Sequence, residues 1–360
     1  MAITTPQCKF SVARLLLIIA VAAWSSAHAA PAPESVFTTV PIIATATPDP
    51  NGWTQLAIVD LESFPWDTQP RFHSRTKTIF KGADVGQLVY CIFPPTWSTE
   101  MFRGGMGAHY HPYWEWGYTL KGDSTLTEPV SPNQKNGMFY RKREGGWLTR
   151  PPYSLHGGGW ATGGKRGQLP YHLLLWEEGD GSVITVGPKA DHFFPDWPDQ
   201  TPDPYLPDDW QSVKGWTRPW LVDSQQDLEW EDDSQIAGRL VKWLDDDMES
   251  GFRSQLVKIP PGWTPPEGMK GSYFENANRM RYLIYGDMKV WLFDGPDDDD
   301  PQAVSVDQDS FIYQPPRSIW GYGPGSVSEK GAIWLEVTYA HGVKHGKGPI
   351  EEPTIIEANR

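Results

Sequence analysis

Short apolar runs, rather than long helical stripes, dominate the chain after its first thirty residues. Runs such as Leu88 to Phe93 combine β-branched and aromatic residues, and Gly, Pro, Asn or Asp separate each run from the next. Strands of four to eight residues bounded by turn-forming residues give this pattern, whereas apolar positions at helical spacing are scarce. The pattern therefore predicts an all-β protein built as a barrel or a sandwich.

Two separated blocks of the sequence recur 164 positions later. The first block contains Tyr118, Leu120, Gly122 and Asp123, which return as Tyr282, Ile284, Gly286 and Asp287. The second contains Pro151, Pro152, Ser154 and Gly157, which return as Pro315, Pro316, Ser318 and Gly321. Upstream, Gln87 to Val89 are echoed at Gln255 to Val257, after 168 positions. Two blocks with one spacing indicate an internal duplication, so we expect two tandem β-barrels.

The first 29 residues have the pattern of a cleavable signal peptide. Lys9 and Arg14 precede an apolar stretch from Leu15 to Trp24, and a small-x-small site ends at Ala29. Ten apolar residues reach about half of the roughly 20 that a membrane span requires. We therefore expect cleavage after Ala29 and a secreted or periplasmic protein.

The repeats and the local composition predict the domain boundaries. Residues 191–235 are rich in Pro, Asp and Trp, which suits a connection between domains because proline cannot donate to a central strand. The predicted segments are 1–29 (signal peptide), 30–60 (extended N-terminal segment), 61–190 (N-terminal barrel), 191–235 (connection), 236–345 (C-terminal barrel) and 346–360 (tail).

Charge and cysteine content narrow the classes of partner. The chain has 31 Lys and Arg against 45 Asp and Glu, a formal charge of −14, whereas nucleic-acid binding needs clustered cations. The sequence contains no run of about 18 apolar residues, the length that would predict a membrane span. No membrane partner is therefore expected after signal cleavage. Once Cys8 leaves with the signal peptide, Cys91 is the only cysteine, and we expect it to be a buried, inert thiol.

Four residues have the types and spacing of a metal site. On a strand, His109 and His111 project to one face, and Glu115 can return to that face after the Pro112 turn. His156, in the second repeated block, is the fourth candidate. Three imidazoles and one carboxylate suit Fe, Mn, Ni, Cu or Zn without distinguishing among them, and leave positions for water or substrate.

These motifs resemble those of the cupin superfamily, and their duplication resembles a bicupin. The resemblance rests on the pattern H-x-H-x3-E at positions 109–115, followed by Tyr118, Gly122 and the P-x4-H-G block that ends at Gly157. The resemblance implies two jelly-roll barrels, with His109, His111, Glu115 and His156 as the metal ligands. Tyr153 replaces the glycine of the usual second motif. Bicupins often associate further, so a homo-oligomer is also expected from the resemblance.

The second copy lacks this ligand set. The equivalent positions are Tyr273, Glu275, Arg279 and Trp320. One carboxylate without an imidazole holds a transition metal poorly, so we expect one metal per chain, in the N-terminal barrel. Glu275 and Arg279 are expected to pair with each other. The C-terminal barrel is then structural, closes the pocket or binds an organic ligand.

Several functions suit one such metal site. The repeated block that ends at Gly157 and the segment from Gly251 to Gly262 are similar to cupins of the dihydroxyacetophenone dioxygenase type. This resemblance implies an iron-dependent dioxygenase acting on a small phenolic, hydroxyketone or diketone substrate. Similarity of the 109–118 segment to oxalate decarboxylase and oxalate oxidase implies a manganese enzyme. Enzymes of that type need an arginine close to the metal, and position 106, three residues before His109, is Met instead. A metal-dependent isomerase or lyase and a non-catalytic protein that binds sugar or another small molecule are further alternatives.

Residues near the predicted ligands are candidates for contact with the substrate. Tyr110, Trp114 and Arg150 are candidates for the pocket, and Arg141 is a second candidate to clamp a carboxylate. For both arginines the favoured interpretation is a structural ion pair or exposure to solvent, and for Tyr110 and Trp114 it is packing in the barrel core or on its outer face. Trp116 and Tyr118 alternate with Glu115 and are expected to point away from the metal.

Overall fold

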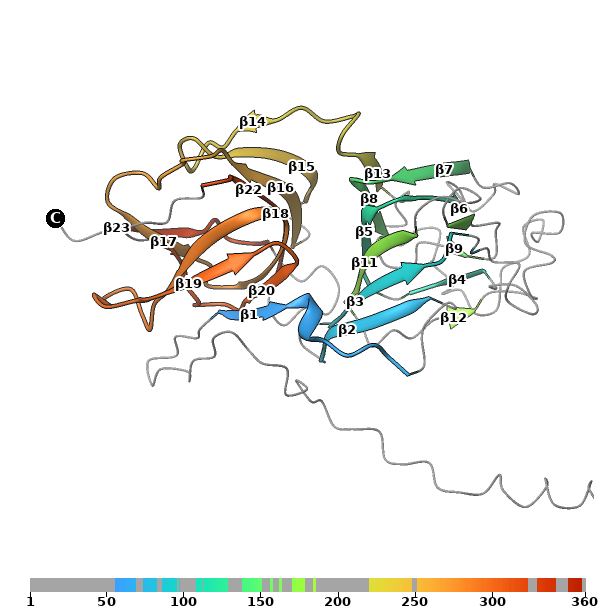
Figure 1. Cartoon of the computed structure of the whole chain (residues 1–360), viewed down its shortest axis with the longest axis horizontal. Coiled ribbons are helices and arrows are strands. Elements are labelled where there is room, and N and C mark those ends of the chain that lie inside the picture. The colour runs from blue at the N-terminus through green and yellow to red at the C-terminus, as the bar shows by residue number, and fades with distance from the viewer. Residues whose placement is uncertain are drawn as a thin grey trace, which may run out of the picture. The chain divides into compact units, whose positions relative to one another are not determined.

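The structure is a computed structural model, and strands make up nearly all of its regular structure (Figure 1). It describes residues 56–68, 74–82, 86–95, 97, 108–111, 113–128, 138–150, 156–157, 162–163, 170–178, 184–185, 220–247, 251–322, 329–340 and 349–357. Within these ranges the only helix is one 3-10 turn, Leu61–Ser63. No helix of the described part has the length and apolarity needed to cross a bilayer. The predicted all-β fold is confirmed.

The N-terminal half is built on a six-stranded antiparallel sheet, with the strand order β13-β8-β5-β11-β3-β2. Its strands are β2 (Arg75–Gly82), β3 (Gly86–Phe93), β5 (Glu115–Lys121), β8 (Gly146–Arg150), β11 (Tyr171–Glu177) and β13 (Trp220–Asp223). Two three-stranded sheets, β10-β6-β7 and β12-β4-β9, complete this half. Their strands are β4 (Ala108–Tyr110), β6 (Asp123–Glu128), β7 (Met138–Arg143), β9 (His156–Gly157), β10 (Thr162–Gly163) and β12 (Ile184–Thr185).

The C-terminal half is one curled antiparallel sheet of eleven strands. Its main path contains β14 (Glu231–Asp232), β15 (Leu240–Asp247), β16 (Phe252–Ile259), β22 (Ala332–Ala340), β18 (Ala277–Leu292), β21 (Trp320–Gly321), β17 (Met269–Tyr273) and β23 (Thr354–Glu357). Beside that path lie β1 (Ala57–Asp60), β19 (Gln302–Asp307) and β20 (Ser310–Gln314). Figure 1 shows the long β18 passing through this half.

Strand pairing agrees with the duplication. Glu115 of β5 lies opposite Arg150 of β8, and Arg279 of β18 lies opposite Gln314 of β20, again 164 positions later in both strands. The recurring glycine also has a physical reason. Gly122 and Gly286 both adopt positive φ, at 78° and 85°, and a Cβ at either position would collide with a neighbouring backbone carbonyl oxygen. Only glycine is free of both penalties.

The alternation of side chains separates two environments in the N-terminal half. Glu115 faces one side of β5, whereas Trp116 and Tyr118 face the other and join a buried aromatic cluster. The indole of Trp116 stacks on that of Trp147, with ring centroids 5.1 Å apart. The same cluster contains residues of the C-terminal half, such as Phe252. The expected direction of Trp116 and Tyr118 is therefore confirmed, and the aromatic side of the sheet joins the two halves.

Three segments that were predicted to lie outside the two barrels contain strands. The extended N-terminal segment 30–60 ends in β1, which pairs with β20 of the C-terminal half. The predicted connection 191–235 contains β13 at the edge of the N-terminal sheet, and also β14. The predicted tail 346–360 contains β23, which pairs with β17 and buries Ile356 in an apolar cluster. The predicted signal peptide and residues 191–219 lie outside the described residues.

Candidate metal centre

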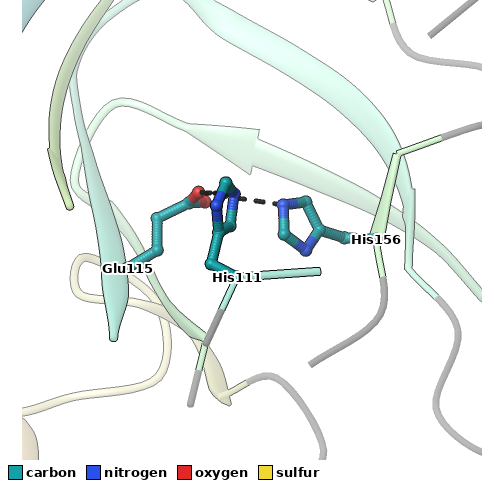
Figure 2. A group of neighbouring side chains, drawn as sticks. All are labelled: His111, Glu115 and His156. Carbon is teal, nitrogen blue, oxygen red and sulfur yellow. Dashed lines mark ion pairs between the residues drawn. The ribbon is translucent and has the colours of Figure 1, made fainter. Parts of the chain in front are cut away.

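Three side chains of the predicted ligand set come together in the N-terminal half (Figure 2). Glu115 is the first residue of β5, His111 follows directly after β4, and His156 lies on β9. β4 pairs with β9, and this pairing sets His109 opposite His156. Pro112, where a turn was expected from the sequence, lies outside the described residues. Strand pairing thus gathers residues that are as many as 45 positions apart.

The three side chains are buried and close to one another. The Nε2 atom of His111 is 3.1 Å from Oε2 of Glu115, and the Nε2 atom of His156 is 3.7 Å from the same oxygen. One donor atom from each residue lies within 4.8 Å of the others. The two imidazole centroids are 5.0 Å apart, and each residue is 3–4% exposed. The donors therefore converge on one point, away from solvent.

Arg150 contacts the other oxygen of the same carboxylate. Its Nη1 atom donates to Oε1 of Glu115, while Oε2 faces the two imidazoles. Burial raises the pKa of Glu115, but Arg150, His156 and His111 outweigh it and hold the pKa well below its usual range. Glu115 is therefore ionised at neutral pH, which is the form that binds a metal.

The donor set fits a divalent transition metal. Ligands at roughly 2.0–2.2 Å from a shared ion lie about 3–4 Å from one another, which matches the distances from Oε2 of Glu115 to the imidazoles. Two imidazoles and a carboxylate are borderline ligands that accept iron, manganese, nickel, copper or zinc. The geometry of the three residues therefore permits a metal without naming one.

The other predicted site residues have different fates. The backbones of His109 and Tyr110 lie on β4, but their side chains fall outside the described part of the structure. Trp114 stacks on Phe252 with ring centroids 5.7 Å apart and an interplanar angle of 3°, so it lies against the C-terminal half. Arg141 pairs with Asp123. Both arginines considered as clamps thus form ion pairs, as favoured from the sequence.

The predicted pairing of Glu275 with Arg279 is wrong. Glu275 precedes β18, and its Oε2 atom lies 3.8 Å from Nε of Arg317. The Nε atom of Arg279 lies 3.6 Å from Oε1 of Glu336. Their separation of four residues favours contact in a helix, but here a strand begins between them. Of the other two equivalents, Tyr273 lies on β17 and Trp320 is buried on β21. Among the described residues, the one group with metal-binding geometry is that of the N-terminal half.

Three neighbours of the site were not identified from the sequence. Tyr113 stacks on His111, with centroids 5.0 Å apart and an interplanar angle of 28°. The buried Glu177 lies opposite Glu115 in the pairing of β11 with β5. Lys142 is also buried, and its Nζ lies 3.7 Å from the place where a Cβ on Gly117 would stand. Tyr113 lies within the H-x-H-x3-E segment at positions 109–115. Glu177 and Lys142 instead approach through strand register, which no local pattern reveals.

Comparison with known proteins supports the fold. No family model matches the chain, and no curated protein matches its sequence. A crystal structure of a candidate dioxygenase from Nostoc punctiforme aligns with a TM-score of 0.52 and 14% identity, over 83% of this chain and 88% of that one. Oxalate decarboxylase from Lactobacillus farciminis gives 0.49 and 14%, over 82% and 87%. The S161A mutant of Bacillus subtilis oxalate decarboxylase gives 0.49 and 13%, over 83% and 78%.

The match to the Nostoc punctiforme structure, over 83% of this chain, supports the predicted fold of tandem β-barrels. At 14% identity the likeness to the Nostoc punctiforme protein concerns the fold alone. Any statement about the reaction must therefore rest on the side chains of this chain.

Proposed function

We propose that this protein is a metal-dependent oxidoreductase with one metal centre in its N-terminal half. The ligands are His109, His111, Glu115 and His156. The reaction we favour is iron-dependent dioxygenation of a small phenolic, hydroxyketone or diketone substrate. The observation that carries the proposal is the buried His–Glu–His group, whose donor atoms lie within 4.8 Å of one another. A structural role alone leaves unexplained why two imidazoles converge on an ionised carboxylate.

The residues around the group have distinct tasks in this proposal. Glu115 presents Oε2 toward the imidazoles because its Oε1 is engaged by Arg150. Stacking on Tyr113 fixes the ring plane of His111. Burial of all three residues keeps bulk water from the donors and strengthens the electrostatic interactions among them. A divalent iron bound there would supply vacant coordination positions for a substrate and dioxygen together.

A second candidate is chemistry on a dicarboxylate, of the oxalate decarboxylase or oxalate oxidase type with manganese. The observation that favours it is Arg150, whose guanidinium lies beside the carboxylate ligand and is largely buried. A guanidinium binds a carboxylate through two parallel hydrogen bonds, so Arg150 could orient an anionic substrate. In this candidate the arginine near the metal is Arg150 of β8, so none is needed at position 106, which is Met.

Metal analysis is the first test. The full chain is purified without chelator, beside a His111→Ala/His156→Ala double variant and a His172→Ala control. His172 lies on β11 and contacts Tyr90 rather than the group. We expect about one equivalent of metal in the wild type and in the control, and almost none in the double variant. Absence of metal from the wild type even after reconstitution would overturn the proposal, as would equal content in the double variant.

Activity measurements then separate the candidate reactions. Oxygen uptake with catechols, hydroxyketones or diketones, lost in the double variant, supports the dioxygenase. Release of CO2 from oxalate without oxygen uptake supports a decarboxylase, and oxygen uptake with oxalate supports an oxidase. Turnover of a carbonyl substrate without either supports an isomerase or lyase. A shift in melting temperature without turnover indicates a binding protein.

We also propose that the chain is exported and that cleavage after Ala29 gives the mature protein. The charged, apolar and small-residue regions of residues 1–29 support this. The mass of the protein recovered from the periplasm or medium tests it, because a mature chain starts at Ala30. A full-length mass in the cytosolic fraction would contradict the proposal.

A further inference from the structure

The interior of the C-terminal half contains a buried polar group in place of a metal site. Arg279 and Arg281 lie two residues apart on β18 and so face the same side of the strand. The Nε atom of Arg281 donates to Oε2 of Glu336 at 2.7 Å, and Arg279 Nε lies 3.6 Å from the other oxygen, Oε1. Gln255 donates to Glu336, and Arg281 donates to Gln314 at 2.8 Å. All five side chains are buried.

Positive charge exceeds negative charge in this interior. Two guanidinium groups, of Arg279 and Arg281, share the single carboxylate of Glu336, while the nearby Arg239 is neutralised by its own partner, Asp233. Burial, together with Arg281 and Arg239 and against the attraction of Glu336, lowers the pKa of Arg279 to about 9. Because a guanidinium stays protonated in proteins, Arg279, Arg281 and Glu336 together carry one uncompensated positive charge.

Three hydrogen-bond donors in the same region have no partner among the described residues. They are Nη2 of Arg281, Nε1 of Trp320 and the hydroxyl of Tyr322, all on residues at most 5% exposed. The guanidinium carbon of Arg281 lies 3.9 Å from the centroid of a Trp320 ring, and Trp320 and Tyr322 belong to one buried cluster. Buried donors are nearly always satisfied, so unpaired ones point to a bound ion or water.

The duplication relates this group to the metal centre. Arg279 stands where the first copy has Glu115, and Trp320 stands where it has His156. A carboxylate acceptor and an imidazole acceptor are thus replaced by side chains that only donate hydrogen bonds. The equivalent location has changed from a set of electron-pair donors to a set of hydrogen-bond donors with a positive charge. Such a set selects an anion.

We propose that the C-terminal half contains an anion site, in which Arg281, Trp320 and Tyr322 bind a small monovalent carboxylate. A monovalent anion balances the one excess positive charge left by Arg279, Arg281 and Glu336. A carboxylate has two acceptor oxygens, which suits the planar donors of a guanidinium better than a spherical ion does. The site is independent of the metal centre and of the reaction proposed for it.

Calorimetric titration with sodium formate tests the site. The full chain carries the His111→Ala/His156→Ala substitutions, so that formate cannot bind at the metal centre, and the buffer contains no halide or carboxylate. We expect one formate per chain. Arg281→Lys keeps the charge opposite Glu336 but lacks the Nη2 donor, and should weaken binding about tenfold or more. Arg253→Lys is the matched control, since Arg253 pairs with the exposed Asp246 and its substitution should leave binding unchanged.

A crystal of the wild-type full chain grown with sodium formate locates the site even if a variant does not fold. We expect a bound formate within hydrogen-bond distance of Nη2 of Arg281. Water alone at that atom, or no saturable formate binding, would overturn the proposal. Equal weakening by Arg253→Lys and Arg281→Lys would also overturn it, because the effect would then be one of general surface charge.

Discussion

Replacing Arg150 by methionine distinguishes two ways in which this residue can act on the metal centre. The guanidinium bonds Oε1 of Glu115, whereas both imidazoles approach Oε2. A metal can therefore take Oε2 while the ion pair stays intact. We expect Arg150 to be a positioning residue that fixes the carboxylate, rather than a competitor that the metal must displace.

The structure sets the size of the expected effect. Loss of a residue that orients a metal ligand costs about 10–100-fold in metal affinity, which is the range we expect for Arg150→Met. The metal-free protein should also lose about 3 kcal/mol of unfolding free energy, the low end for breaking a buried ion pair. The low end applies because the Arg150 side chain is 13% exposed, and because His111 and His156 remain beside Glu115.

Competition titrations with a chelator measure the metal affinity, and urea unfolding of the metal-free protein measures the stability. Arg141→Met is the matched control, because Arg141 also pairs with a carboxylate, Asp123, but is 42% exposed. We expect that control to keep the wild-type metal affinity and to change stability by about 1 kcal/mol or less. If Arg150→Met binds metal as tightly as the wild type, Arg150 does not position the ligand, and if it binds metal more tightly, Arg150 competes with the metal. Either result refutes the reasoning.

Three further predictions concern stability. Burial raises the pKa of Glu336, but the surrounding arginines outweigh this and hold the pKa well below the ordinary value. The ionised carboxylate therefore stabilises the fold above about pH 4.3, and this stabilisation is lost as the pH falls further. In urea unfolding, Glu336→Gln should be less stable than the wild type at pH 7, and the difference in unfolding free energy should narrow below about pH 4.3. Trp114→Ala removes the stack on Phe252 and should cost about 2 kcal/mol in the same assay while metal content stays unchanged, and loss of metal would contradict this. Gly286→Ala should be far more destabilising than Gly262→Ala, which should cost about 1 kcal/mol, because both have positive φ but only Gly286 has a backbone oxygen where a Cβ would stand; equal melting temperatures would refute this.

Local pattern was sufficient to predict the strands and the duplication. Runs of β-branched and aromatic residues become strands such as β3, and the repeated Gly122 and Gly286 adopt the same positive φ. The ligand spacing was informative because each motif is short. His111 and Glu115 are four residues apart, so one turn brings them together, and His156 belongs to the second repeated block.

Partners across strands could not be predicted in the same way. Arg150 meets Glu115 from 35 residues away, and Arg281 meets Glu336 from 55 residues away. Both contacts follow from strand register, which is set by the packing of the whole sheet. The wrong pairing of Glu275 with Arg279 has the same origin, since nearness in sequence was used where register decides.

The two halves show how one scaffold can acquire opposite electrostatic preferences. Alternation along each strand keeps apolar residues such as Trp116 and Met280 on the side where the halves meet, and leaves the other side free to vary. On that inner side, Glu115 has an arginine partner and two imidazoles, whereas Arg279 shares a single carboxylate with a second arginine. Packing constrains the first side in both copies, so the inner side is where their chemistry diverged. If the first copy binds a cation and the second an anion, a few inner substitutions suffice, and the fold need not change.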